Sequence, residues 1–165
     1  MKEIHVTGFT ASVTNAELGY AAEFFGIVLL PEKLDKNICV HIHVGDVADD
    51  SFGSCIWTDN NHRPRIFYIE IKTDMTRAKT IKVLAHEMTH LKQYAKGELK
   101  DFVTPSKRHL NKWKGETVER NQYYWTSPWE IDAYGHEPGL WEMYNMRLKA
   151  DAKKLRQKKK EWEEV

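Results

Sequence analysis

The sequence contains little cysteine, and the two residues present, Cys39 and Cys55, do not form a CxxC pair. Two cysteines are too few for a disulfide framework, and without the paired spacing there is no basis for a zinc ribbon. This cysteine usage is typical of a reducing compartment. We therefore expect the protein to work in the cytoplasm.

Long apolar runs are also missing. The most apolar stretch, FFGIVLLP from Phe24, is far shorter than the roughly 20 residues that a membrane-spanning helix needs. The first residues, MKEIHVTGFTASV, contain no apolar core of signal-peptide length. No membrane partner and no secretory leader are expected.

Net charge is nearly absent as well, at +1 over 165 residues, so the whole chain has no field that would select nucleic acid. The composition, 41% hydrophobic and 30% charged, is that of a globular protein, and the length suits a single domain over residues 1–165. Residues 146–165 are the exception, with eight Lys or Arg against four Asp or Glu. We predict a basic helical C-terminal extension there, which is either a solvated helix end or a polyanion-binding tail.

Hydrophobic periodicity predicts both strands and helices, and therefore an α+β fold. The expected strands cover residues 4–6, 38–44, 53–58 and 65–72, and the expected helices cover 15–30, 76–96 and a last long segment from Pro128. The third and fourth strands are joined by DNNHRP and should pair antiparallel. Residues 98–126 show no clear pattern and are interpreted as a polar connection. His41 and His43 share one strand face and are interpreted as exposed or hydrogen-bonded side chains rather than ligands.

The helix over 76–96 contains the motif HEMTH, from His86 to His90. Residues four apart lie on the same face of a helix, so the two imidazoles can point at one metal ion. Glu87 is rotated by about 100° from His86 and can flank that ion, where it could accept a proton from water. This is the HExxH arrangement of zinc hydrolases, and a pair of solvated histidines is the alternative.

A catalytic zinc ion usually has three protein ligands, so a third is expected downstream. Glu130 and Asp132 lie in TSPWEIDAYGHE, but they are about 200° apart on a helix and cannot both face the metal. Glu130 could instead form a capping box with Ser127, three residues before it. Other candidates for the third ligand are Asp132 and a histidine such as His136 or His109.

HEMTH, followed about forty residues later by PWEIDA, resembles the gluzincin-like zinc metallopeptidases, especially small HExxH proteins of bacteria and phages. The resemblance covers roughly residues 76–137. It implies a zincin-like core with a small, mostly antiparallel sheet, an active-site helix and a long C-terminal helix. It also implies that Glu130 completes the zinc site with His86 and His90. Related families often place an aspartate that orients a histidine where this chain has Tyr134.

The function predicted from the motif and the resemblance is a zinc metallopeptidase that hydrolyses peptide bonds with a metal-activated water and Glu87 as general base. Its cofactor would be Zn²⁺, its substrate a peptide or protein, and its compartment the host cytoplasm if the chain is phage-encoded. Tyr124 and Tyr134 are candidate donors to the oxyanion, together with the two downstream histidines. The exposed strand over 54–58 is expected to pair with the substrate. The alternative is a catalytically inactive zincin-like binding or structural protein, which could use the basic C-terminal helix to contact a partner or nucleic acid.

Overall fold

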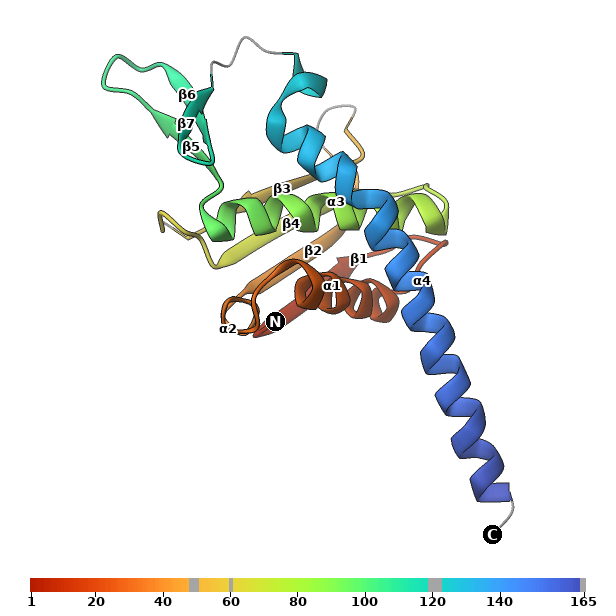
Figure 1. The fold of residues 1–165 in the computed structure, drawn as a ribbon. Coiled ribbons are helices and arrows are strands. Elements are labelled where there is room, and N and C mark those ends of the chain that lie inside the picture. The colour runs from red at the N-terminus through yellow and green to blue at the C-terminus, as the bar shows by residue number, and fades with distance from the viewer. Residues whose placement is uncertain (48–50, 60, 119–122, 164–165) are drawn as a thin grey trace.

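The computed structural model describes residues 1–47, 51–59, 61–118 and 123–163. The chain forms two sheets and a layer of helices, in an α+β arrangement (Figure 1). The elements in chain order are β1 (Glu3–Gly8), α1 (Asn15–Leu29), α2 (Glu32–Asp35), β2 (Cys39–Gly45), β3 (Gly53–Trp57), β4 (Ile66–Lys72), α3 (Arg77–Lys96), β5 (Leu99–Val103), β6 (His109–Trp113), β7 (Glu116–Val118), the 3-10 turn η1 (Tyr124–Thr126) and α4 (Pro128–Glu163).

The larger sheet has four strands in the order β1-β2-β4-β3. β1, β2 and β4 are parallel, and β3 pairs antiparallel with β4 as the DNNHRP connection predicts. The expectation of a mostly antiparallel sheet is therefore wrong for this sheet, which is mixed. The physical reason is the long connection through α1 and α2, because only a crossover of this length can return the chain to a parallel neighbour.

One face of the four-stranded sheet is covered by α1 and α3 (Figure 1). Val40, Ile42 and Val44 of β2 point into this core and are buried, as their alternation predicts. Helix α3 lies where the sequence predicts it. Thr76 caps its first turn by accepting a hydrogen bond from the backbone N–H of Lys79, and Gly97 ends it in the left-handed conformation, with φ of 71°.

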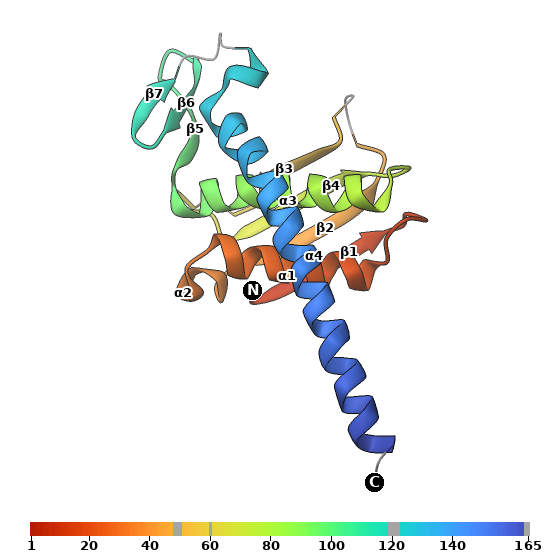
Figure 2. The same ribbon diagram turned by 45° about the vertical axis from the view of Figure 1, so that its right-hand side comes forward.

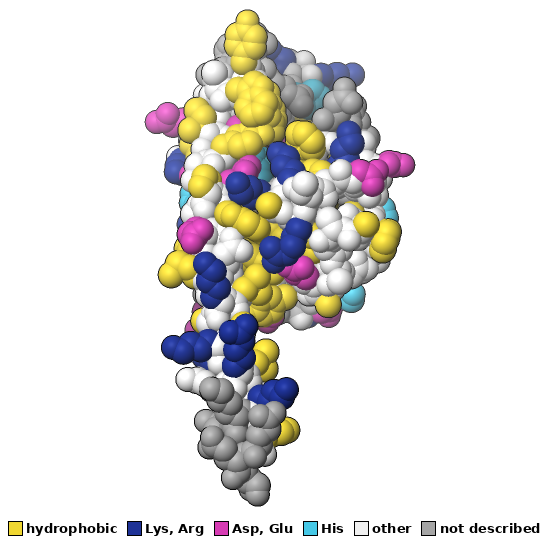
Figure 3. All heavy atoms as spheres, turned by 90° about the vertical axis from the view of Figure 1, so that its right-hand side faces the viewer, with side chains coloured by type: hydrophobic (Ala, Val, Ile, Leu, Met, Phe, Trp, Pro, Cys, Tyr) yellow, Lys and Arg dark blue, Asp and Glu magenta, His cyan; other side chains and the backbone are white. Residues whose placement is uncertain are grey.

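Helix α4 begins at Pro128 as expected and forms a third layer that crosses α3 and α1. Its first half packs on the body, with Leu140 and Tyr144 buried in the core. Its second half extends away from the body in both ribbon views (Figures 1 and 2). Figure 3 shows Lys and Arg side chains along the described part of this projection. The last two residues of the predicted extension, 164–165, lie outside the described part of the chain.

The segment between α3 and α4 is not an irregular connection, and this expectation is wrong. It forms a three-stranded antiparallel sheet in the order β5-β6-β7. Its strands are three to five residues long and carry charged side chains on both faces, so they give no clear hydrophobic alternation. Residues 119–122 of this segment are not among the described residues.

Among the residues that the structure describes, no helix is both long enough and apolar enough to span a membrane. The longest helix, α4, is rich in charged residues over its whole exposed half.

Candidate metal centre

The two histidines of HEMTH lie one helical turn apart on α3 and point at the same place. Their Nε2 atoms are 3.0 Å apart, and both side chains are buried beneath α4. Glu130, from the first turn of α4, places its carboxylate against them, with oxygen atoms 3.3 Å from His86 Nε2 and 3.4 Å from His90 Nε2. These three residues can offer one ligand atom each within 4.8 Å of one another.

Gln93 fixes the orientation of His90. The Oε1 atom of Gln93 lies 2.9 Å from His90 Nδ1, while its amide nitrogen donates to the carbonyl of Trp129 and to the carboxylate of Asp132, each at 2.9 Å. The amide cannot be reversed, because its oxygen would then face two acceptors. His90 Nδ1 must therefore carry the proton that Gln93 accepts, and this leaves a lone pair on Nε2.

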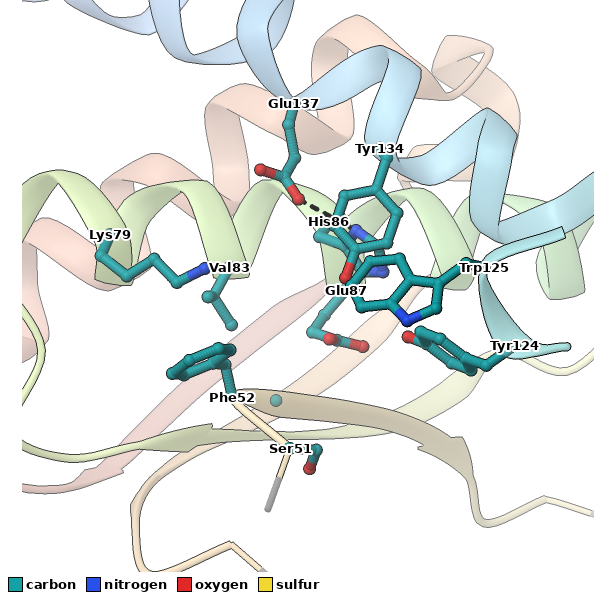
Figure 4. Close-up of a pocket in the computed structure, with 11 residues that line it drawn as sticks. Ser51, Phe52, Lys79, Val83, His86, Glu87, Tyr124, Trp125, Tyr134 and Glu137 are labelled. Atoms are coloured by element: carbon teal, nitrogen blue, oxygen red, sulfur yellow. Dashed lines mark hydrogen bonds and ion pairs between the residues drawn. The ribbon is translucent and has the colours of Figure 1, made fainter. Parts of the chain in front are cut away.

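Glu137 holds His86 in the same way. Its Oε1 atom lies 3.1 Å from His86 Nδ1, so the ring donates that proton to the carboxylate (Figure 4). Glu137 follows Glu130 by seven residues, two turns further along α4, and thus shares its helix face. A carboxylate behind a histidine ligand fixes the ring and makes its free nitrogen a stronger donor to a metal.

The arrangement is suited to a cation. Two Nε2 lone pairs cannot face each other at 3.0 Å without something positive between them, which is either a proton or a metal ion. The Glu130 Oε2 atom is buried and accepts no hydrogen bond from any residue that the structure describes. Two imidazoles and one carboxylate are the ligand set of catalytic zinc sites. These residues therefore fit a divalent metal ion.

The electrostatics of the site also favour positive charge. Burial lowers the pKa of His86, but the carboxylates of Glu130 and Glu137 outweigh it and raise this pKa to about 9. Burial raises the pKa of Glu130, but the two imidazoles outweigh it and lower this pKa to about 2. A metal ion must displace the proton that the histidines otherwise share, so metal binding releases a proton.

Glu87 lies beside the three ligands and does not join them. Its carboxylate is buried against β3, where the backbone of Gly53 comes so close that an added Cβ would lie 2.9 Å from Glu87 Oε1. Burial raises the pKa of Glu87 to about 7, and the neighbouring imidazoles counteract part of this effect. A carboxyl group with a pKa near neutrality can both accept and release a proton.

A cavity of about 340 Å³ opens in front of Glu87 and His86. Figure 4 shows Glu87 facing this space, with Phe52 on one side and Trp125 on the other. Val83 of α3 adds a further apolar wall, and the ammonium group of Lys79 lies 4.2 Å from the centre of the Phe52 ring. The buried carboxyl group of Glu87 therefore lines an accessible cavity.

The two tyrosines singled out in the sequence both lie at this cavity (Figure 4). The ring of Tyr134 lies against that of His86, with centroids 4.4 Å apart. Burial and the nearby Glu130 carboxylate raise the pKa of Tyr124, and burial also raises the pKa of Tyr134. Both hydroxyl groups thus remain protonated at neutral pH and can donate hydrogen bonds.

The alternative third ligands lie elsewhere. Asp132 accepts from Gln93 and lies 3.5 Å from the ammonium of Lys92. His136 is bonded through Nδ1 to the carbonyl of Asp132, and His109 is exposed on β6.

Glu130 does not form a capping box with Ser127. In a capping box the glutamate would accept a hydrogen bond from the Ser127 N–H group, but this group donates to the carbonyl of Tyr124. Two strand histidines, His41 and His43, lie on the outer sheet face. The ring of His41 stacks on His5, and His43 is hydrogen bonded to Thr7 at 3.0 Å. They take no part in the metal centre.

The residues that orient the ligands, Gln93 and Glu137, are missed by sequence reasoning. Their spacing was the available signal, because Gln93 follows His90 by three residues and Glu137 follows Glu130 by seven.

The structure thus brings together a buried His86, His90 and Glu130 group consistent with an HExxH-type site on α3 and a downstream glutamate on α4. Its geometry is the basis for a functional assignment, because the comparisons supply none. No family model, no curated protein and no solved structure matches the chain.

Proposed function

We propose that the protein is a zinc-dependent metallopeptidase of the HExxH type, with His86, His90 and Glu130 as metal ligands and Glu87 as general base. One observation carries this proposal. The Nε2 atoms of the two histidines lie 3.0 Å apart and within 3.4 Å of the buried Glu130 carboxylate. Glu87, which is not one of the three ligands, lies beside them at the cavity. A purely structural metal site is closed and has no use for such a base.

Different residues of the chain would carry out different parts of the reaction. A zinc ion bound by the three ligands would act as a Lewis acid toward water and the substrate carbonyl. Glu87 takes a proton from the attacking water and passes it to the leaving amine, for which a pKa of about 7 is well matched. Tyr124 and Tyr134 are the groups positioned to donate hydrogen bonds to the developing oxyanion.

Strand β3 supports a peptide as the substrate. It is an edge strand, because the sheet order is β1-β2-β4-β3, and it runs beside α3. An extended peptide can pair with the free edge of β3 and pass Glu87 at Gly53. The apolar walls of the adjacent cavity, Val83, Phe52 and Trp125, suit an apolar side chain of that peptide.

The test is peptide cleavage by the zinc-loaded protein and by its Glu87→Gln variant. The proposal predicts that the wild type cleaves members of a peptide library and that Glu87→Gln lowers turnover by at least about 100-fold with zinc still bound. Equal turnover in the two proteins would refute the role of Glu87. A zinc-loaded wild type that cleaves nothing would leave a metal-binding protein without peptidase activity.

A further inference from the structure

A second cavity lies at the opposite end of β3 and α3 from the cavity at Glu87. It has a volume of about 330 Å³ and is bordered by the end of β3, the last turns of α3 and the small sheet β5-β6-β7. The rings of Trp57 and Tyr94 form one wall, with centroids 4.5 Å apart. Tyr94 follows His90 by one turn of α3, so this cavity lies about one helical turn beyond the metal centre.

We infer that this second cavity is a specificity subsite that receives an acidic side chain of the substrate, a step that rests on the proposed function. Its position sets the distance from the cut bond. Tyr94 is four residues beyond His90, about 6 Å along a helix, and Trp57 is four residues beyond Gly53, about 13 Å along a strand. An extended peptide advances about 3.3 Å per residue, so the cavity receives a side chain about two to four residues from the scissile bond.

The direction of the substrate follows if the peptide pairs antiparallel with β3, the more stable of the two pairings. A peptide that adds antiparallel to β3 runs from Trp57 toward Gly53, because β3 itself runs the other way. The second cavity therefore lies on the amino-terminal side of the scissile bond. The cavity beside Glu87 then takes a side chain on the carboxyl-terminal side.

The charge of the cavity selects the side chain. Lys100 of β5 and Lys112 of β6 both line it, and they are direct partners across the two antiparallel strands. Like charges opposite each other in a sheet are destabilising, and an anion between them removes that penalty. Among the described residues that line the cavity, Asp101 is the one acid, and it accepts hydrogen bonds from Asn111 and Tyr94. Two lysine ammonium groups therefore face one carboxylate, which leaves an excess of positive charge.

The aromatic surface suits the rest of an acidic side chain. Phe102 lines the same cavity, and the ammonium of Lys112 lies 5.4 Å from the centre of its ring. The methylene groups of a glutamate can pack on Trp57 and Phe102 while its carboxylate reaches the two lysines. A lysine or arginine in the substrate would meet two like charges instead.

The test compares Lys100→Glu/Lys112→Glu with the control Lys149→Glu/Lys153→Glu on the projecting part of α4, which changes the net charge by the same amount. The probes are two rhodamine-labelled octapeptides, one with three glutamates among alanines and one with glutamines in their place. Their binding is measured by anisotropy on the full, zinc-loaded chain carrying Glu87→Gln. We expect the glutamate peptide to bind about ten-fold more tightly than the glutamine peptide. The cavity variant should abolish this difference and the control should keep it.

Equal binding of the two peptides, a preference that persists in the cavity variant, or a preference lost in the α4 control would each overturn the inference. Cleavage of a peptide library separates this outcome from failure of the proposed function. A library cut without enrichment of Asp or Glu two to four residues before the cut contradicts the subsite and leaves the peptidase intact. An uncut library with the expected binding difference contradicts the peptidase and keeps the anion-selective cavity.

Discussion

Gln93 holds His90 in one orientation, and Glu137 does the same for His86. Each accepts the Nδ1 proton of its histidine, so that both Nε2 atoms are left free to face each other and Glu130. Gln93 is fully buried and makes two further hydrogen bonds. The metal centre therefore depends on residues that do not touch the metal.

Replacing Gln93 by leucine tests this dependence. Gln93→Leu removes the acceptor of the His90 proton, so zinc affinity should fall by about 10-fold to 100-fold in a chelator competition. The variant also removes the two hydrogen bonds that the Gln93 amide donates to Trp129 and Asp132, which should lower the free energy of unfolding by about 1–3 kcal/mol. Unchanged zinc affinity would show that Gln93 has no orienting role.

Glu137 offers a matched pair of variants. Glu137→Gln keeps an oxygen that can accept from His86 Nδ1, whereas Glu137→Leu does not. We expect Glu137→Leu to lose about 10-fold or more in zinc affinity and Glu137→Gln to lose clearly less. Equal losses in the same chelator competition would mean that the charge of Glu137, and not the hydrogen bond, is what matters.

The proposed metal ligands were easier to predict from the sequence than the residues that orient them. HEMTH has a fixed local spacing on one helix, and Glu130 stands at the start of another helix with clear starting signals. Gln93 and Glu137 belong to no such motif. Glu137 reaches His86 only when α4 packs against α3, which brings together residues 51 positions apart in the chain. Gln93 lies on the same helix as His90, but its amide is oriented by its hydrogen bonds to Trp129 and Asp132 of α4.

At the scale of elements, β3 and α3 must lie very close together for Glu87 to be placed. Gly53 allows this approach, because a Cβ there would lie 2.7 Å from Val83 Cγ1 and 2.9 Å from Glu87 Oε1. The antiparallel β3–β4 pair was predictable from its loop, and α3 from its caps. The parallel order of the other strands was not, because it depends on where the crossover through α1 and α2 places β2.

A methyl group at position 53 should displace the general base Glu87 without affecting metal binding. Gly53→Ala is expected to lower peptide turnover by up to about 100-fold, because Glu87 must move, while zinc content stays the same. Ser54→Ala is the control, since its side chain points to the other sheet face and donates to Glu70. Wild-type turnover in Gly53→Ala would show that β3 does not determine the position of Glu87.

At the scale of the whole molecule, the metal centre connects two helices, because His86 and His90 belong to α3 and Glu130 to α4. A bound ion would therefore link the two helices and stabilise the fold. At 100 times the dissociation constant, zinc should add about 2.7 kcal/mol to the free energy of unfolding. For a domain of this size we expect Tm to rise by about 5–10 °C with zinc and to fall again with chelator.

Glu130→Ala provides the control for this shift, because it removes the only ligand that α4 contributes to the group of three. Its Tm should respond to zinc clearly less than that of the wild type. A zinc-induced rise of the same size in both proteins would place the stabilising metal at another site.

Bound metal in the purified protein is the most direct measurement of the proposed centre. Elemental analysis should find about one zinc per chain in the wild type and in Glu87→Gln, and almost none in Glu130→Ala. Asp132→Asn and His136→Ala, at the alternative ligand positions, should keep their zinc. A wild type without metal after zinc reconstitution and dialysis, or a Glu130→Ala variant with full zinc content, would contradict the His86, His90 and Glu130 site.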